Sequence, residues 1–535
     1  MAARPITDVD SREDTGRRQR PMLPEVEPLL RPPADPPHRW WRDRALAVVV
    51  GLGLTFAGVF AALSVLRYRT FSTGRFDLGN MVQTVWSTTE GRFLETTDVS
   101  GVQFNRLGAH VDPVLALFAP LWWVWSSPEL LLVAQALIVA TGALPAFWLG
   151  RRWLGDDRLA VAGAAVYLLY PALQSATLFD FHPVTLAAPL LMFCIWAAEE
   201  GRYAVLAACA ALAALTQEQV GLMLVGLAVW MALRHPRRRR AALVLGAGGL
   251  AWVVIALGVI MPAFAIDGAN PHLSRYDSLG DSPFDIALTF VTRPWDALAI
   301  VATPGRAAYL AALLLPLLLL PLAAPVLALA AVPQLLINLF ASSGPVQTVE
   351  YHYGVVLVPF LVAATLLGLA SLRDGGRPRR LGRWVRRPPL VAGTLVGAVL
   401  VAGMFQGPLP LWGWLPGGYG GSALHRFTDD DQVRALREAV ALIPAGARVS
   451  AANGPGSHLS DRRRILLFPK IGNSDYVLLA DNERYRDMAR ERPTLRPPGY
   501  RFAALRLAQS SRWEVIYDHE GVSLYRRLPR EPRSS

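Results

Sequence analysis

Long blocks of apolar residues, separated by short clusters of arginine, constrain this 535-residue chain more than any other feature. A helix needs about 20 apolar residues to cross the hydrocarbon core of a bilayer, where no water is present to satisfy an open backbone. Hydrophobic residues make up 53% of the chain and charged residues only 18%, which argues against an ordinary soluble protein. The blocks predict about eleven transmembrane helices, at 45–66, 128–149, 158–177, 183–198, 203–217, 219–233, 241–265, 307–321, 324–341, 353–372 and 388–406.

The orientation of these helices follows from the positions of the arginines. Segment 113–125 is apolar but short and carries Trp122, Trp123 and Trp125, so we interpret it as an interfacial helix rather than a span. With that choice, the N-terminal tail and the internal arginine clusters all fall on one side of the membrane. Because cytoplasmic loops carry the excess of positive charge, the sequence predicts a plasma-membrane protein with a cytoplasmic N-terminus.

The composition divides the chain into four parts. Residues 1–44 are polar and rich in Pro and Arg, and are expected to form a disordered cytoplasmic tail. A transmembrane domain over 45–406, with a long outer loop at 67–127, is followed by a linker at 407–421 and an extracytoplasmic α/β domain at 422–535. In that last domain we predict a helix at 429–442 and strands at 448–452, 465–468, 476–480, 513–517 and 522–526.

The net charge of +12 does not indicate a nucleic-acid partner. Nearly all of the basic charge is arginine, Lys470 being the only lysine, and it lies between apolar blocks as a topology signal. Cys194 and Cys209 lie inside apolar blocks, so neither a structural disulfide nor a Cys/His zinc site is predicted.

Ionisable residues collect in the loops that this topology places outside the membrane. Such groups at membrane depth are costly and usually functional, so their convergence predicts a polar site at the outer interface. The candidates are Arg75, Asp77, His110, Asp112, Asp180, His182, Glu218, Arg275, Glu350 and His352. His110, Asp112, Asp180 and His182 have donor types that suit zinc or manganese, but no two of them have the helical spacing of an HExxH site. A divalent metal therefore stays an open question, and no cofactor is assigned.

Each of the central candidates also has a simpler explanation. Asp77 could cap a helix at 78–88, and Asp180 and His182 could cap and solvate the start of the next span. Glu218 could be the polar tip of a helical hairpin, and His352 could satisfy a local hydrogen bond. The combination of these residues is therefore more informative than any one of them.

Several stretches resemble the predicted membrane proteins of the domain-of-unknown-function family numbered 2079, over about residues 70–480. They are 75–86, 110–113, 170–173 with 179–183, 217–221 and 351–353, with weaker similarity at 457–460, Arg462 and 468–469. The motif at 217–221 departs from the family pattern, which has Lys-Glu-Asp where this chain has Gln217, Glu218 and Gln219. That departure leaves the roles of the two flanking positions open.

The family in turn resembles the GT-C superfamily of polytopic glycosyltransferases. This resemblance implies transfer of a sugar from a polyprenyl-phosphate lipid to a cell-envelope acceptor outside the membrane, with inversion at the anomeric carbon. It implies Asp77 as the general base, with Asp180 and His182 also catalytic and the other candidates binding substrate. A transporter or flippase, and a non-catalytic membrane scaffold, remain as alternatives.

Overall fold

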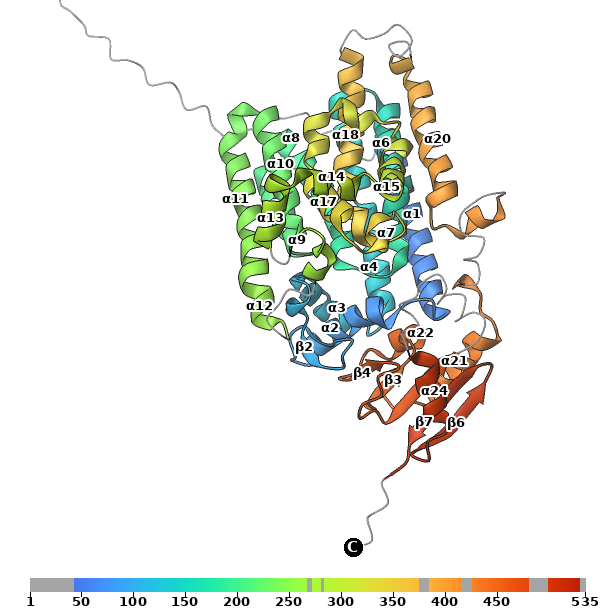
Figure 1. The fold of residues 1–535 in the computed structure, drawn as a ribbon. Coiled ribbons are helices and arrows are strands. Elements are labelled where there is room, and N and C mark those ends of the chain that lie inside the picture. Colours follow the sequence, from blue (N-terminus) through green and yellow to red (C-terminus); the bar gives the residue numbers. More distant parts are fainter. Residues whose placement is uncertain are drawn as a thin grey trace, which may run out of the picture. The chain divides into compact units, whose positions relative to one another are not determined.

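The computed structural model describes residues 43–266, 272–280, 283–374, 384–415, 426–480 and 499–529. Most of these residues are helical, and the strands are confined to a short hairpin and one small sheet near the C-terminus (Figure 1). The expected tail at 1–44 lies almost wholly outside the described residues, as do parts of the linker and of the C-terminal region. The domain boundaries therefore stay predictions.

Six helical segments among the described residues are long and apolar enough to cross a bilayer. They are Arg44–Arg69, Glu129–Leu154, Pro183–Glu200, Pro236–Phe264, Gly344–Arg373 and Pro388–Gln406. Two further pairs qualify only as bent spans, Asp157–Leu169 with Pro171–Phe179 at 43° and Pro294–Val301 with Pro304–Leu317 at 68°. The described part of the chain is thus a polytopic helical membrane protein with six to eight candidate spans.

The expectation of eleven spans is higher than this number because three of the apolar blocks form short or broken helices. Helices α9 (Tyr203–Ala214) and α10 (Val220–Arg234) have 12 and 15 residues. At 1.5 Å per residue they measure about 18 and 22 Å, less than the roughly 30 Å of the hydrocarbon core. The block at 324–341 is divided into α16 (Pro325–Leu329) and α17 (Val332–Phe340).

The segment expected to lie at the interface contains only two short helices, η4 (Pro113–Phe118) and α3 (Ala119–Trp122), and no candidate span. Trp123 and Val124 at its end are 71% and 87% exposed. Exposed apolar side chains of this kind suit the boundary between lipid and water. The loop at 67–127 thus contains η2 (Arg75–Gly79), helix α2 (Asn80–Thr89) and the hairpin strands β1 (Glu95–Thr97) and β2 (Gln103–Asn105), and ends in this apolar segment.

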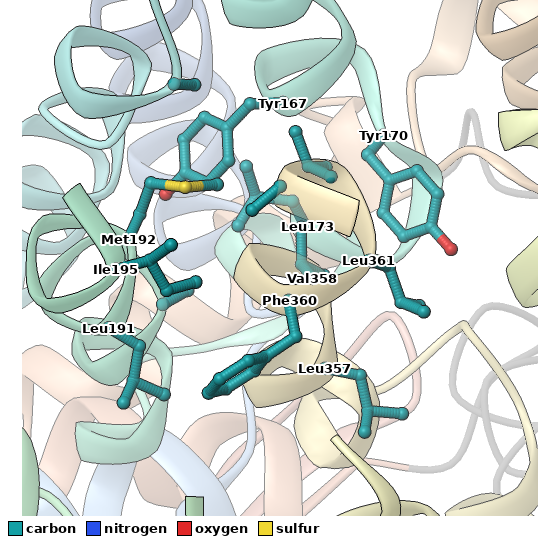
Figure 2. Close-up of a cluster of buried hydrophobic side chains, with 14 of the residues drawn as sticks. Tyr167, Tyr170, Leu173, Leu191, Met192, Ile195, Leu357, Val358, Phe360 and Leu361 are labelled. Carbon is teal, nitrogen blue, oxygen red and sulfur yellow. The ribbon is translucent and has the colours of Figure 1, made fainter. Parts of the chain in front are cut away.

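The core of the helical bundle forms where α6 (Asp157–Leu169), α7 (Pro171–Phe179), α8 (Ala187–Glu200) and α18 (Val358–Asp374) pack together. Figure 2 shows Tyr167, Leu191, Met192 and Phe360 buried in this cluster. The break between α6 and α7 falls at Tyr170, whose ψ is 123°, because the residue before a proline is driven out of the helical region. The break lets α7 end at Phe179, so that the next residues leave the bundle as a loop.

The remaining helical elements complete the bundle and its loops. They are α1 (Arg44–Arg69), η2 (Arg75–Gly79), η3 (Arg106–Gly108), α4 (Glu129–Ala140), α5 (Ala143–Leu154), η5 (Pro183–Leu186), η6 (Pro236–Arg238), α11 (Arg239–Ile255), η7 (Ala256–Ile260), α12 (Met261–Phe264), η8 (Leu273–Tyr276), α13 (Pro283–Thr292), α14 (Pro294–Val301), α15 (Pro304–Leu314), η9 (Leu315–Leu317), η10 (Leu320–Ala323), η11 (Gly344–Gln347), η12 (His352–Leu357), α20 (Pro388–Gln406) and η13 (Pro410–Trp414).

The C-terminal segment, residues 426–480 and 499–529, forms a five-stranded sheet in the order β4-β3-β5-β7-β6. Its strands are β3 (Val449–Ala451), β4 (Ile465–Leu467), β5 (Tyr476–Ala480), β6 (Trp513–His519) and β7 (Val522–Arg527), each close to its predicted position. Strand β3 is parallel to β4 and β5, whereas β7 is antiparallel to β5 and β6. Its helices are α21 (Asp431–Ala441), α22 (Asn453–Gly456), η15 (Ser457–Leu459) and α24 (Tyr500–Ala508). This segment is a small α/β unit, as expected.

Candidate active site

A cavity of about 660 Å³ lies between the outer loop and the ends of the helices. It is lined by residues from the first outer loop, the α9–α10 turn, the segment around His272, helix α17 and η12, and it is also reached by Leu467 of β4. Eight of the ten candidate residues line it: Arg75, Asp77, His110, Asp112, His182, Glu218, Arg275 and His352. The fold thus brings together side chains that are separated by up to 277 positions in the sequence.

The carboxylate of Asp77 faces this cavity from η2, a π-helical turn that leads directly into α2. Asp77 is not the N-cap of either element, since those positions are Gly74 for η2 and Gly79 for α2. Its Oδ1 atom lies 3.4 Å from Nε2 of His182, which precedes the short helix η5. The imidazole of His182 is stacked on that of His352, with ring centroids 3.7 Å apart.

Asp180 lies beneath this group and not on the cavity wall, and its residue is 1% exposed. Its Oδ2 accepts a hydrogen bond of 3.0 Å from the backbone N–H of Gly74, and its Oδ1 lies 3.7 Å from Nη2 of Arg67. Arg67 also donates to the carbonyl of Phe179 at the end of α7. Asp180 therefore connects the end of α7 to the start of the turn that carries Asp77, whereas His182, the N-cap of η5, makes no side-chain capping bond.

Arg75 is 4% exposed, and its guanidinium is occupied by protein groups. It donates to Oδ1 of Asn80, to Oε1 of Gln83 at 3.0 Å and to the carbonyl of Thr97 at 2.9 Å. Burial lowers the pKa of Arg75 to about 9. Its hydrogen bonds fix the turn, α2 and β1 to one another, which leaves little of this cation for a substrate.

A second arginine of the cavity wall, Arg106, is held by Asp112. Its Nε and Nη2 atoms donate to the carboxylate over 2.6–3.0 Å, in a bidentate pair that is almost completely buried. Burial raises the pKa of the Asp112 carboxyl, although the neighbouring Arg106 opposes that effect. The pair closes the loop between β2 and η4.

At another part of the cavity, Glu218 stands in the turn between α9 and α10. Its carboxylate accepts a 2.9 Å hydrogen bond from the N–H of Val111 and lies 3.1 Å from Nδ1 of His110, whose ring stacks on His272 at 4.3 Å. Burial alone would raise the pKa of Glu218, but His110 and these hydrogen bonds bring it below its ordinary value. Glu218 is therefore a fixed anion, and not merely the polar tip of a hairpin.

His272 is neutral in this arrangement, because burial and the nearby His110 and Arg275 lower its pKa to about 3. Its Nε2 lies 2.9 Å from the carbonyl oxygen of Ala109, which can only accept a hydrogen bond, so Nε2 carries the proton. This contact fixes the segment around His272 to the outer loop.

Arg275 differs from the other two arginines on the cavity wall. Its guanidinium lies over the ring of Tyr353, 5.9 Å from the ring centroid, and within the described residues it has no ion pair. Glu350, by contrast, is exposed and does not line the cavity. Among the cavity's arginines that the structure describes, Arg275 is the one available to an anionic ligand.

The sequence interpretation missed several polar residues of the cavity wall. Gln334 and Asn338 lie on α17, where Nε2 of Gln334 donates to Oδ1 of Asn338 at 2.8 Å and Nδ2 of Asn338 donates to the hydroxyl of Tyr309 at 2.8 Å. Two amides at a spacing of four inside an apolar block were the available signal, because polar side chains in such blocks usually face the protein interior.

No group of three or more His, Cys, Asp or Glu residues in the described ranges is arranged to hold a metal ion. The donors considered from the sequence are divided between two places, with His182 beside Asp77 and His110 beside Glu218. Asp112 and Asp180 are each engaged by an arginine.

Comparison with known proteins finds both similar solved structures and a matching family. The crystal structure of ArnT from Cupriavidus metallidurans in the apo state is similar with a TM-score of 0.48 and 13% identity, over 89% of this chain and 98% of that one. No curated protein matches the sequence. The family described as "Predicted membrane protein (DUF2079)" matches residues 67–524, a stretch that includes every candidate site residue and most of the C-terminal sheet. The chain therefore belongs to the DUF2079 family of predicted membrane proteins.

Proposed function

We propose that this protein is a membrane glycosyltransferase that moves a sugar from a polyprenyl-phosphate donor to an acceptor hydroxyl on the extracytoplasmic side. The observation that supports this most is the meeting of the Asp77 carboxylate and the Arg275 guanidinium in one cavity. A general base and an available cation are the two groups that such a transfer needs. The GT-C resemblance of the sequence motifs points to the same reaction class.

In the proposed reaction, the acceptor oxygen forms a bond to the anomeric carbon as the bond from that carbon to the phosphate oxygen breaks. Asp77 takes the proton of the acceptor hydroxyl, and the electron pair of the broken bond leaves on the lipid phosphate. A single displacement of this kind inverts the anomeric centre. His182, 3.4 Å from Asp77, holds the carboxylate in place while the proton is transferred.

The leaving phosphate requires positive charge or hydrogen-bond donors in a site of low dielectric constant. Arg275 supplies that charge in the proposal, because Arg75 and Arg106 are committed to protein partners. His352 lies on the same wall and serves as a donor to phosphate or sugar oxygens. The amide groups of Gln334 and Asn338 already donate to protein acceptors. Glu218 accepts from sugar hydroxyls, a role that suits a carboxylate kept ionised by His110.

The proposal includes an orientation. The arginine clusters of the helix ends, such as Arg151 with Arg152 and Arg237 with Arg238, lie in the cytoplasm. The cavity and the C-terminal segment then lie outside the plasma membrane, where a cell-envelope acceptor is available. The polyprenyl chain of the donor lies in the bilayer and its phosphate enters the cavity.

The test has two stages. The wild-type protein is purified in mild detergent and its co-purifying lipids are identified by mass spectrometry; a polyprenyl phosphate carrying a sugar supports the proposal. Asp77→Asn is then compared with Glu90→Gln, which removes an exposed carboxylate from the same loop. We expect Asp77→Asn to insert and fold normally, to retain the glycosylated lipid and to lose transfer, whereas Glu90→Gln keeps it.

Full transfer by Asp77→Asn would remove Asp77 from the role of base. Recovery of bulk phospholipid alone, together with uptake of a solute into vesicles that contain the protein, would favour the transporter instead.

A further inference from the structure

The turn that carries Asp77 is packed directly against the C-terminal segment. Phe76 lies in the first turn of η2, where backbone N–H groups have no acceptor within the helix. Its N–H donates a 3.0 Å hydrogen bond to Oδ1 of Asn453, the first residue of α22 and 377 positions further along the chain. Next to it, the hydroxyls of Thr73 and Ser457 lie 2.9 Å apart in a buried contact.

Three glycines show how closely the two parts approach. A Cβ added at Gly79 would lie 2.5 Å from Oγ of Ser460, and one added at Gly456 would lie 2.7 Å from Cβ of Arg75. A Cβ at Gly74 would lie 2.9 Å from Nδ2 of Asn453 and 3.4 Å from Oδ2 of Asp77. The side chains of Asn453 and Asp77 therefore border the same small space, with no room for an intervening residue.

The segment just before the turn is part of the hydrophobic core of the C-terminal segment. Phe71 is 3% exposed and packs in the cluster that contains Val449, Leu459 and Leu524. His458 lies between the rings of Tyr68 and Phe71, with centroid distances of 4.0 and 3.9 Å. Helix α22 and η15 both contact η2, and Figure 1 shows α22 on the side of the sheet nearest to α1 and α2.

We infer from these contacts that the C-terminal segment is a structural part of the active site, and that Asn453 is a positioning residue for Asp77. Asn453 satisfies the N–H of the residue before Asp77 and thereby sets the direction of the carboxylate. π-Helical turns are rare and are frequently found at functional sites. The inference depends on the proposed role of Asp77 as base and gives the C-terminal segment a role in that reaction.

The first measurement does not depend on activity. Hydrogen–deuterium exchange of the full-length protein in detergent, read by mass spectrometry, follows the amide of Phe76 in the wild type, Asn453→Ala, Asn453→Asp and Asn473→Ala. Loss of one hydrogen bond of about 1 kcal/mol predicts several- to tenfold faster exchange in Asn453→Ala. Asn453→Asp retains an acceptor oxygen and restores protection, and Asn473→Ala, in an exposed turn of the same segment, leaves it unchanged.

The second measurement is the rate of sugar transfer with the lipid donor extracted from the wild-type protein. A misplaced base lowers the rate of the chemical step, so Asn453→Ala should lower kcat about 10- to 100-fold with little change in KM for the donor. Asn453→Asp should recover kcat with its optimum moved to higher pH, since a second carboxylate raises the pKa of Asp77.

Wild-type protection of Phe76 in Asn453→Ala, or an unchanged kcat in that variant, would overturn the inference. A wild-type protein that transfers no sugar contradicts the proposed function alone, because the exchange measurement still decides whether Asn453 holds the turn. A higher KM for the donor with an unchanged kcat would assign Asn453 to substrate binding instead and would also overturn the inference.

Discussion

The Nε2 atom of His182 lies 3.4 Å from Oδ1 of Asp77, and the ring of His182 is itself stacked on His352. His182 directly precedes η5, and His352 is the first residue of η12, 170 positions further along the sequence. The stack restricts the rotation of the His182 ring, and the ring in turn restricts the Asp77 carboxylate. In the proposed transfer, a base held in this way meets its substrate in one orientation.

Replacement of His182 by Gln should therefore lower kcat for transfer about 10- to 100-fold with a small effect on KM, because the carboxylate loses its orientation and not its charge. His519→Gln, which changes an exposed histidine on β6, is the matched control. Steady-state kinetics on both variants checks the prediction. Equal kcat values for His182→Gln and the wild type would show that Asp77 works without this neighbour.

Arg275 should determine donor affinity. Because hydrogen bonds to charged groups contribute about 1.5–3 kcal/mol, Arg275→Ala should weaken binding of the polyprenyl-phosphate donor about 10- to 100-fold. Arg275→Lys keeps the charge but loses the planar fork, so its affinity should lie between the two. Arg293→Ala, on an exposed arginine of the neighbouring loop, is the control. Binding of the extracted donor to the immobilised protein measures the difference, and unchanged affinity in Arg275→Ala would place the phosphate elsewhere.

The buried pair of Arg106 and Asp112 should be important for stability. Removing one partner leaves an uncompensated buried charge, so Arg106→Ala should cost about 3–5 kcal/mol of unfolding free energy. Arg92→Ala breaks the partly exposed pair with Glu95 and should cost about 1 kcal/mol or less. Denaturant unfolding in detergent compares the two variants. The double variant Arg106→Met with Asp112→Leu should be more stable than Arg106→Ala, and a less stable double variant would contradict the electrostatic explanation.

The C-terminal segment should lose stability on acidification through His458. Burial lowers the pKa of His458 to about 3, although its hydrogen bond to the carbonyl of Tyr68 opposes the shift, and Arg437 is the nearby charge that adds to it. Between about pH 6.5 and 3 the unfolded chain therefore binds a proton that the folded chain does not. Stability is complete above that window and falls within it, by about 2 kcal/mol at pH 5.

His458→Phe keeps an aromatic ring between Tyr68 and Phe71 and removes the titration. The variant should be less stable at neutral pH, because the hydrogen bond is lost, yet its stability should vary less between pH 7.5 and 5. Denaturant unfolding at both pH values measures this. If the stability of His458→Phe depended on pH as steeply as that of the wild type, groups other than His458 would cause the effect. His519→Gln, which removes an exposed histidine, is the control.

The helices and strands of this chain could be predicted from local sequence, because apolar length and alternation determine them. The apolar block predicted at 388–406 forms α20, and the short strands at Val449 and Ile465 lie where strands were predicted. The number of spans was harder to predict from the sequence. Between Tyr203 and Arg234 the apolar character continues, but two short helices separated by Glu218 replace full spans, since Glu218 is anchored by His110 and Val111 of the outer loop.

The sequence indicated most of the charged residues that line the cavity, but not which of them are already engaged by protein groups. Arg75 and Arg275 have the same charge and a similar place in an outer loop. Only the fold shows that Arg75 is surrounded by Gln83 and Thr97 while Arg275 faces the cavity. The capping role considered for Asp77 was wrong for a related reason, because the π-helical turn moves the N-cap to Gly74 and leaves the carboxylate for the cavity.

The burial of Phe71 in the C-terminal core also constrains the order of events during biosynthesis. The ribosome completes the loop with Asp77 early, but Asn453 and the core around Leu459 and Leu524 are made hundreds of residues later. A nascent chain can therefore insert its helices while the turn that carries Asp77 still lacks support. In the proposed reaction, transfer therefore waits until the residues around Asn453 have been made and have packed against this turn.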